Sequence, residues 1–298
     1  MKKIGKILLV FLMIFSAISS QKNVYAYNEP LRFELLPLVQ DTDVSSISNY
    51  ASTYSEDEAR NIIRQRLKKA YLNGDSEVSI EDLNLSTDKL GFVSYLRYYF
   101  PFISNGAELE RVSCRNNTLT KIYITNSMSI DETKKYFDAI DQEVSSIISL
   151  VSPSMDDEMK ALIIHDYFVN YCQYQMSDFN DDSYKSGGII YKKVGVCQAY
   201  AYAYQYILNQ LGIECFITSS STMNHAWNII EINHHYYHVD VTWDDPMLIG
   251  DGIIPEKSKY KYFLKGSKTM NENHFISGKF TDGGQTFTYP TLSVEDYE

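Results

Sequence analysis

The sequence predicts an α+β fold in which a helix that begins at a cysteine packs on an antiparallel sheet, with a small α+β domain ahead of it. After Cys197, apolar residues recur at helical spacing until Gly212, which is suited to ending a helix. Residues 225–232 and 235–242 instead alternate between apolar and polar side chains, as two strands joined by a two-residue turn do. Helix-start signals and a second hairpin upstream predict the N-terminal domain.

Length and composition indicate a globular chain with room for two domains. The chain has 298 residues, of which 44% are hydrophobic and 22% are charged. The dipeptide Pro153-Ser154 interrupts the helical pattern and marks the expected boundary. We therefore predict a small domain with an irregular leader at residues 27–152 and a second domain at residues 153–298.

Residues 1–26 have the order of features found in a secretory signal peptide. Lys2 and Lys3 precede an apolar run at residues 7–18, and Val24-Tyr25-Ala26 offers a cleavage site. The run is short for a membrane span, so we expect cleavage rather than an uncleaved anchor. The mature protein is expected to be secreted or associated with the cell surface, without an integral membrane segment.

The acidic balance of the chain argues against several classes of partner. The formal net charge is −11, and removing the lysine-containing residues 1–26 would make it more negative. Nucleic acids are bound mainly through cationic side chains, so we expect no nucleic-acid partner. Simple electrostatic adsorption to anionic membranes or wall polymers is disfavoured for the same reason. The sequence leaves the oligomeric state open.

The N-terminal domain is predicted from local signals. Residues 27–54 lack a pattern and are expected to be an irregular arm. Capping boxes at Ser55–Glu58 and Ser129–Glu132 each predict the start of a helix. Residues 109–115 and 118–125 read as two strands joined by an Asn-Asn turn. No chemistry is indicated here, which leaves a structural appendage or a substrate-positioning role.

Cys197 is the candidate nucleophile because it lies at the start of a predicted helix. Unpaired backbone N–H groups and the positive end of the helix dipole favour a thiolate there, and the thiolate is the reactive form. The alternative is a buried thiol without chemistry, which we expect for Cys172 and Cys215. No CxxC pair or His/Cys cluster has zinc spacing, so we predict no metal.

The hairpin supplies a candidate base and its orienting carboxylate. In a two-residue turn Ile232 faces His235, which extends to Trp227 facing Asp240. His225 is two residues from Trp227 and shares its face, so it becomes a diagonal neighbour of Asp240. A three-residue turn would place the two on opposite faces. We predict that Asp240 orients the imidazole and that His225 deprotonates the thiol.

Three further residues of the hairpin region have open roles. His238 lies two residues from Asp240 and is the rival base, although we expect it to be structural. Trp227 and Trp243 flank the base and the aspartate. We assign them to walling the site from water, with ordinary core packing as the alternative.

Over residues 155–275 the chain resembles the bacterial transglutaminase-like proteins of the papain-like fold. The motifs that carry the resemblance are IHDY at 164–167, GVCQAYA at 195–201, LGIECF at 211–216, HAWN at 225–228, HVDVTWDDP at 238–246, and YFL at 262–264 with His274. The resemblance implies a papain-like core with Cys197 as nucleophile, His225 as base and Asp240 as third member. Ala199 departs from the family, in which glycine is frequent at this position.

The resemblance implies acyl transfer on a carboxamide or peptide bond of a protein or peptide substrate, without a cofactor. Association with the cell wall stays open. Two alternatives remain, because one fold hosts several activities: a cysteine peptidase or amidase of the same fold, and a non-catalytic cell-surface binding module.

Overall fold

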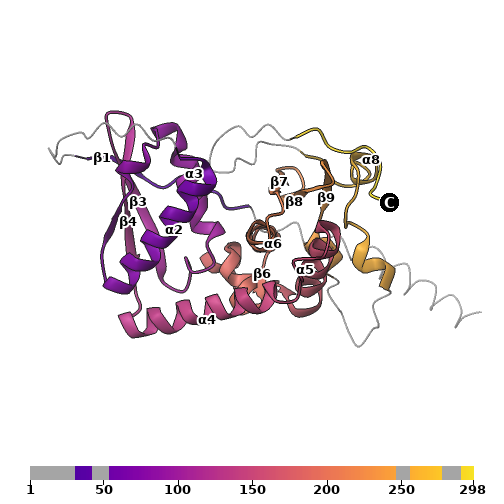
Figure 1. The fold of residues 1–298 in the computed structure, drawn as a ribbon, viewed down its shortest axis with the longest axis horizontal. Helices are drawn as coiled ribbons and strands as arrows, with labels where there is room; N and C mark the ends of the chain where they lie inside the picture. The colour runs from indigo at the N-terminus through magenta and orange to yellow at the C-terminus, as the bar shows by residue number, and fades with distance from the viewer. Residues whose placement is uncertain (1–30, 42–53, 246–255, 277–289) are drawn as a thin grey trace, which may run out of the picture.

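A computed structural model describes residues 31–41, 54–245, 256–276 and 290–298 (Figure 1). The predicted signal peptide at residues 1–26 lies outside these ranges. The described chain is an α+β fold with one sheet at its N-terminal side and a second sheet beyond the central helix α6 (Cys197–Gln210), so the predicted fold class is confirmed. None of the described helices is long and apolar enough to cross a membrane.

The N-terminal sheet has four strands within the described residues, in the order β1-β3-β4-β2. Their bounds are Leu38–Gln40 for β1, Glu77–Ser79 for β2, Ala107–Arg115 for β3 and Thr118–Asn126 for β4. The predicted hairpin of β3 and β4 is confirmed, and both turn residues, Asn116 and Asn117, have positive φ as a tight turn requires. The arm expected to be irregular contains β1, which pairs in parallel with β3. Sequence patterning missed this strand because it is only three residues long.

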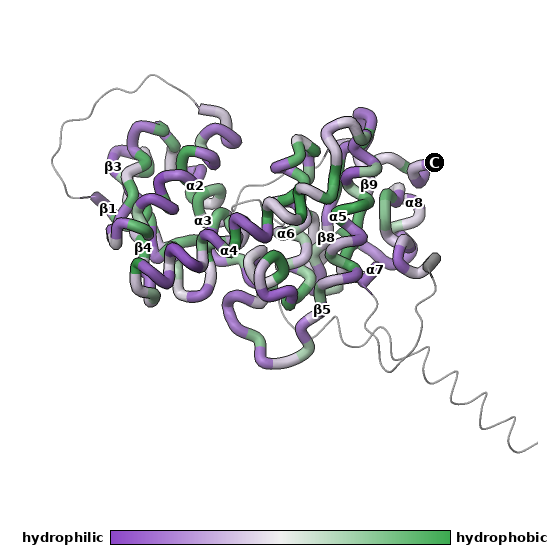
Figure 2. The backbone as a smooth tube through the Cα atoms, turned by 60° about the horizontal axis from the view of Figure 1, so that its bottom comes forward, coloured by the Kyte–Doolittle hydropathy of each residue, from purple (hydrophilic) through white to green (hydrophobic). Residues whose placement is uncertain are grey.

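Three helices accompany this sheet: α2 (Glu56–Asn73), α3 (Leu90–Tyr99) and α4 (Ile130–Ile148). Both predicted capping boxes are present, at Ser55 with Glu58 and at Ser129 with Glu132. Each satisfies backbone N–H groups that the first helical turn leaves unpaired. Gly74 ends α2 with φ of 75°. Hydrophobic and hydrophilic stretches alternate along α2 and α4 in Figure 2, as in helices that bury one face.

The C-terminal part places α6 against a three-stranded antiparallel sheet in the order β7-β8-β9. The remaining elements are α5 (Asp157–Tyr171), β5 (Gln173–Tyr174), β6 (Val194–Gly195), β7 (Cys215–Ser220), β8 (His225–Ile232), β9 (His235–Val239), α7 (Val241–Asp244) and α8 (Ser267–Met270). Short 3₁₀ turns lie at Glu81–Leu83, Thr87–Lys89, Asp181–Tyr184 and Glu256–Tyr260, with a π-helical turn at Gly188–Lys192. As predicted, α6 stops just before Gly212, which has φ of 79°.

The β8–β9 hairpin confirms the predicted register. Ile232 pairs with His235 across a two-residue turn, and the ladder continues to Asn228 with Val239. The predicted extent of the second strand is wrong: β9 ends at Val239 rather than at residue 242, so Trp227 and Asp240 are not a ladder pair. The physical reason is that Asp240 caps α7, because its carboxylate accepts the backbone N–H of Trp243.

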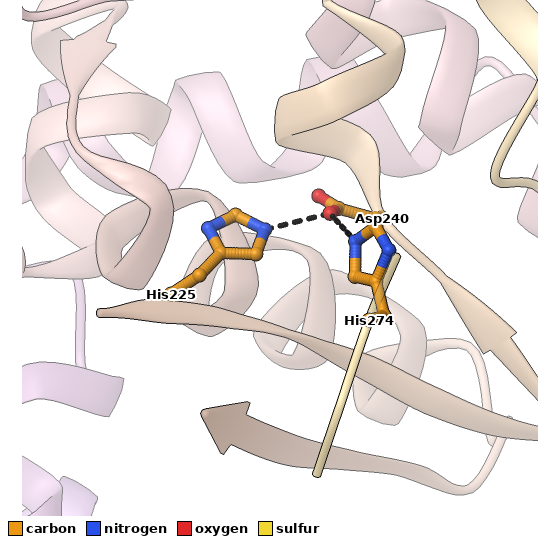
Figure 3. A group of neighbouring side chains, drawn as sticks. All are labelled: His225, Asp240 and His274. Carbon is orange, nitrogen blue, oxygen red and sulfur yellow. Dashed lines mark hydrogen bonds and ion pairs between the residues drawn. The ribbon is translucent and has the colours of Figure 1, made fainter. Parts of the chain in front are cut away.

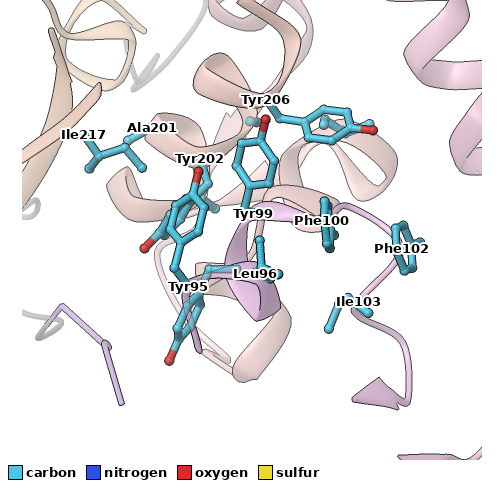
Figure 4. Packing of buried hydrophobic residues seen from close by; sticks show 14 of the residues in the cluster. Tyr95, Leu96, Tyr99, Phe100, Phe102, Ile103, Ala201, Tyr202, Tyr206 and Ile217 are labelled. Atoms are coloured by element: carbon cyan, nitrogen blue, oxygen red, sulfur yellow. The ribbon is translucent and has the colours of Figure 1, made fainter. Parts of the chain in front are cut away.

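The two parts of the chain share one contiguous apolar core. Aromatic side chains of α3 meet those of α6 at the junction, where the rings of Tyr99 and Tyr206 have centroids 5.2 Å apart (Figure 4). Tyr98 stacks on Tyr202 at 5.7 Å. Buried residues from both parts belong to the same cluster. The division at residues 152 and 153 therefore stays a prediction, although it falls in the connection between α4 and α5.

Candidate active site

Cys197 is the first residue of α6, at the helix end that favours an anion. Its side chain is buried, with 3% of the residue exposed. Gly195 precedes it, and a Cβ at that position would lie 2.8 Å from the Cβ of Ala199. Glycine therefore allows the chain to enter the helix closely packed against its first turn.

His225 and Asp240 are in contact, as the hairpin register predicts. His225 Nε2 lies 2.6 Å from Asp240 Oδ2, and neither residue is exposed (Figure 3). The other carboxylate oxygen accepts the Trp243 backbone N–H at 3.1 Å. The cap that ended the strand early thus also fixes the carboxylate in the orientation that the imidazole needs.

The Cys197 side chain acts on the same imidazole. Burial alone would lower the pKa of His225, but the Asp240 carboxylate and the Cys197 side chain outweigh it and raise this pKa to about 10. Nδ1 of His225 has no hydrogen-bond partner among the described residues, so this nitrogen is available to the thiol. Burial would raise the pKa of Asp240, but His225 and His274 hold it well below its ordinary value. The site therefore favours an imidazolium beside a carboxylate at neutral pH.

Both predicted tryptophans contact the candidate base. Trp227 stacks on His225 with ring centroids 5.7 Å apart and an interplanar angle of 17°, and Trp243 lies at 5.3 Å and 32°. These apolar faces surround the imidazole and reduce its contact with water. The contacts fit the site-wall role, although packing of the same rings also contributes to the core around them.

His238, the rival base, has another partner. It pairs with Ile229 in the ladder, and its Nδ1 accepts the indole N–H of Trp227 at 3.0 Å. Burial and the neighbouring His274 lower the pKa of His238 to about 4, so it stays neutral at neutral pH. In this geometry His238 positions Trp227, and the imidazole that contacts Asp240 from the hairpin is that of His225.

His274 is a site residue whose role is not predicted from the sequence. Its Nε2 lies 2.8 Å from Asp240 Oδ2, the same oxygen that contacts His225 (Figure 3). It stands 34 positions after Asp240, so no hairpin register or motif spacing relates the two. The one available signal was its place after the Tyr262–Leu264 segment in the family resemblance.

The three side chains in Figure 3 also form a group whose ligand atoms lie within 4.8 Å of one another. Such a group can in principle hold a cation, and spacing rules did not indicate it because His274 is distant in the chain. Here Asp240 Oδ2 hydrogen-bonds both Nε2 atoms, at 2.6 and 2.8 Å. These bonds account for the cluster, since a protonated ring nitrogen cannot ligate a metal. The expectation of no metal stays a prediction.

A second buried His–Asp pair joins α7 to α5. His165 Nε2 lies 3.2 Å from Asp244 Oδ2, and that carboxylate accepts the Tyr262 backbone N–H. Burial raises the pKa of Asp244 to about 6. The neighbouring Asp245 accepts the Tyr200 hydroxyl, and burial raises its pKa to about 7. These contacts fasten α7, and with it Asp240, to α5 and α6.

The elevated pKa of His225 predicts a pH dependence of stability. A folded-state pKa of about 10, above the ordinary value of about 6.5, means that the native state binds the proton more tightly. The resulting stabilisation is complete below pH ~6.5 and is lost as the pH rises through about 10. The difference in melting temperature between wild type and His225→Gln should therefore shrink over this interval. Scanning calorimetry measures it, and a constant difference would contradict the coupling.

The four cysteines predict a selective labelling pattern. All are free and buried, so exposure does not distinguish them. Burial raises the pKa of Cys172 to about 12, whereas Cys197 has a helix N-terminus and an imidazolium beside it. Cys197 should react with iodoacetamide at least about tenfold faster than Cys114, Cys172 or Cys215. Peptide mapping decides this, and equal labelling of all four would exclude Cys197 as an activated thiol.

Comparison with known proteins assigns a family to the region that holds these residues. Residues 147–241 match the Transglutaminase-like superfamily. A solved structure described as "Crystal structure of a TGase" is 14% identical, with a TM-score of 0.32, and the match covers 57% of this chain. The chain spans 50% of that structure's length. A search of curated proteins found no match. Cys197, His225 and Asp240 all lie in the matched range, and residues 147–241 are a transglutaminase-like superfamily domain.

Proposed function

We propose that the chain is an exported cysteine-nucleophile enzyme that transfers an acyl group from a carboxamide or peptide bond through Cys197, His225 and Asp240. One observation carries the proposal. The buried His225 contacts Asp240 through Nε2 at 2.6 Å, while the Cys197 side chain acts on the same ring. This is the relation that nucleophile, base and orienting group need in cysteine catalysis.

The proposed reaction starts from the ion pair that forms when the Cys197 thiol gives its proton to His225, which is the protonation state of His225 that its raised pKa favours. The sulfur attacks the carbonyl carbon, forming a C–S bond, and the carbonyl oxygen gains negative charge. The backbone N–H of Cys197, at the start of α6, is the oxyanion donor that we propose. When the C–N bond breaks, His225 returns the proton to the leaving amine. An acyl-enzyme then remains on the sulfur.

Asp240 contributes by holding the imidazole rather than by exchanging protons. Its Oδ2 fixes Nε2 of His225, which directs Nδ1 to the sulfur, and it stabilises the imidazolium that forms. His274 fixes the carboxylate from the other side. In the second half of the reaction a primary amine or water attacks the acyl carbon, its proton passes to His225, and the C–S bond breaks to release the Cys197 thiolate. The choice of acceptor separates a transglutaminase from a peptidase or amidase.

The test is intact-mass analysis after incubation with a glutamine-containing protein and a labelled primary amine. Amine incorporation that requires Cys197 supports transfer. Cleavage or deamidation of the protein without incorporation supports the peptidase or amidase. If Cys197→Ala matches wild type in every assay, the acyl-transfer proposal is wrong, and a binding module becomes the better account.

The export that we propose has its own test. The basic, apolar and small-residue order of residues 1–26 supports cleavage after Ala26. Material secreted by an expressing bacterium should begin near Tyr27 by N-terminal sequencing. Extracellular protein with an intact Met1 would contradict cleavage.

A further inference from the structure

The segment ahead of β1 lies against the two residues that adjoin the proposed nucleophile and base. The backbone N–H of Leu31 donates to Asn224 Oδ1 at 2.9 Å, and Asn224 immediately precedes His225. The backbone N–H of Arg32 donates to Gln198 Oε1 at 2.9 Å, and Gln198 immediately follows Cys197. Although these contacts join positions 193 and 166 residues apart, they converge at the starts of β8 and α6.

The Gln198 side chain hydrogen-bonds both backbone groups of Arg32, the N–H and the carbonyl. Besides accepting the N–H, its side-chain amide donates to the Arg32 carbonyl at 2.7 Å. A primary amide that pairs with both groups of one residue recognises an extended chain without regard to its side chain. Gln198 is fully buried, and a buried amide left without partners is costly. The position is therefore suited to a peptide backbone.

The Arg32 side chain contacts an aromatic ring and a carboxylate. Its guanidinium lies 4.2 Å from the ring centroid of Tyr184 and 3.5 Å from the carboxylate of Asp181. An aromatic face combined with a carboxylate favours a cationic side chain. The 3₁₀ turn that carries both residues is followed by the π-helical turn at Gly188–Lys192 and then by β6, the strand that leads to Cys197.

The other end of the segment contacts helix α3 and then joins the N-terminal sheet. Phe33 packs on Tyr98, the Leu36 backbone N–H donates to Ser94 Oγ at 2.9 Å, and β1 then pairs with β3. Residues 31–36, which we call the arm, thus reach from β1 to α6 (Figure 1). With the arm in place, Cys197 and His225 are both buried.

We propose that Gln198 and Asn224 form a subsite for an extended peptide backbone, that Tyr184 and Asp181 accept a basic side chain beside it, and that the arm occupies this subsite in competition with substrate. This proposal rests on the proposed function, because it names the substrate of that enzyme as an extended polypeptide with an arginine or lysine. The arm then resembles a bound substrate, and its displacement opens the site.

The first experiment measures binding to a full-length chain that cannot turn over. The probe is a fluorescein-labelled peptide with the sequence of residues 28–36, NEPLRFELL, added to Cys197→Ala protein. A tethered arm competes at high effective concentration, so this protein should bind the probe weakly. Adding Arg32→Ala weakens only the tethered arm, since the probe keeps its arginine. Anisotropy should then show about five- to tenfold tighter binding.

Matched variants distinguish peptide binding at the subsite from a general destabilisation of the fold. Arg66→Ala removes a cation of similar exposure from an ion pair with Asp82 in the N-terminal part, and it should leave probe binding unchanged. Gln198→Leu in the arm-weakened protein should abolish probe binding, with unchanged circular dichroism. A probe with alanine in place of its arginine should bind more weakly. If Arg32→Ala lowers the melting temperature without exposing a peptide-binding site, the arm is only a structural strap, and the proposal is overturned.

The second experiment follows the thiol. With Cys197 present, Arg32→Ala should raise its rate of alkylation by iodoacetamide about five- to tenfold, whereas Arg66→Ala should not. An unchanged alkylation rate in Arg32→Ala would contradict the proposal that the arm occupies the subsite. Neither experiment requires acyl transfer. Probe binding without catalysis would therefore support the subsite and refute the proposed function. Catalysis without probe binding would support the proposed function and refute the subsite.

Discussion

Replacing His225 with alanine is expected to reduce acylation of Cys197 to background. His225 is the imidazole between the Asp240 carboxylate and the Cys197 side chain, so its loss removes both the proton acceptor and the charge that favours a thiolate. The expected loss is at least about 10³-fold, in the range that removal of a general base with its nucleophile activation produces. The measurement is the rate of covalent labelling by a mechanism-based inhibitor that mimics an acyl donor.

His238→Ala is the matched control for this result. His238 lies in the same hairpin and is also buried, but it accepts the Trp227 indole N–H and has no contact with Asp240 comparable to that of His225. It should keep most of the labelling rate, with a moderate loss from the freed indole. If His225→Ala labels at the wild-type rate on protein with unchanged circular dichroism, the triad is wrong. A selective loss in His238→Ala would instead identify the rival base.

Asp240→Asn is expected to leave the fold intact and to slow acylation by up to about 10⁴-fold. An asparagine oxygen can still accept the Trp243 N–H, and asparagine is a good helix cap. Its NH₂ group would however face His225 Nε2, which favours the wrong imidazole tautomer and removes the charge that stabilises the imidazolium. Neutralising the orienting carboxylate of a catalytic triad costs this order of magnitude.

His274→Gln separates the roles of the two imidazoles that contact Asp240. Glutamine keeps a hydrogen-bond donor near the carboxylate, so this variant should lose far less labelling rate than Asp240→Asn. Equal losses in the two variants would mean that His274 belongs to the essential set. An Asp240→Asn protein that labels at the wild-type rate would remove the carboxylate from the mechanism.

Local signals predicted the framework of the site because they act over a few residues. Asn233 and His234 both adopt positive φ, and the two-residue turn that they form fixes the hairpin register. The capping boxes at Ser55 and Ser129 fixed two helix starts, and Gly212 fixed the end of α6. These patterns determined which strand and which helix present His225 and Cys197.

The extent of β9 could not be predicted, because two local preferences compete at Asp240. The alternation continues through Val239 and Val241 and favours a strand, whereas an aspartate before Trp243 also suits a helix cap. In the structure the cap prevails, and it is held by the His165–Asp244 pair from α5. Tertiary contacts thus decided between two sequence patterns of similar strength.

The remaining site residues depend on segments that are far apart in the chain. His274 reaches Asp240 from 34 residues away, and Arg32 reaches Gln198 from 166 residues away. Neither contact has a periodicity or a motif of its own. Patterning predicts only that residues 27–54 are irregular, and the arm at residues 31–36 indeed has no regular secondary structure. The role proposed for the arm follows only from the partners of its backbone N–H groups, which are Asn224 and Gln198.

The most direct test of the acyl-transfer mechanism is to trap the covalent intermediate. A glutamine-containing peptide would be mixed with the enzyme, quenched in acid and mapped by mass spectrometry. The mechanism predicts an acyl adduct on Cys197 in wild type, with none on Cys114, Cys172 or Cys215, and none in His225→Ala. An adduct on another residue, or turnover of the peptide by Cys197→Ala, would contradict it.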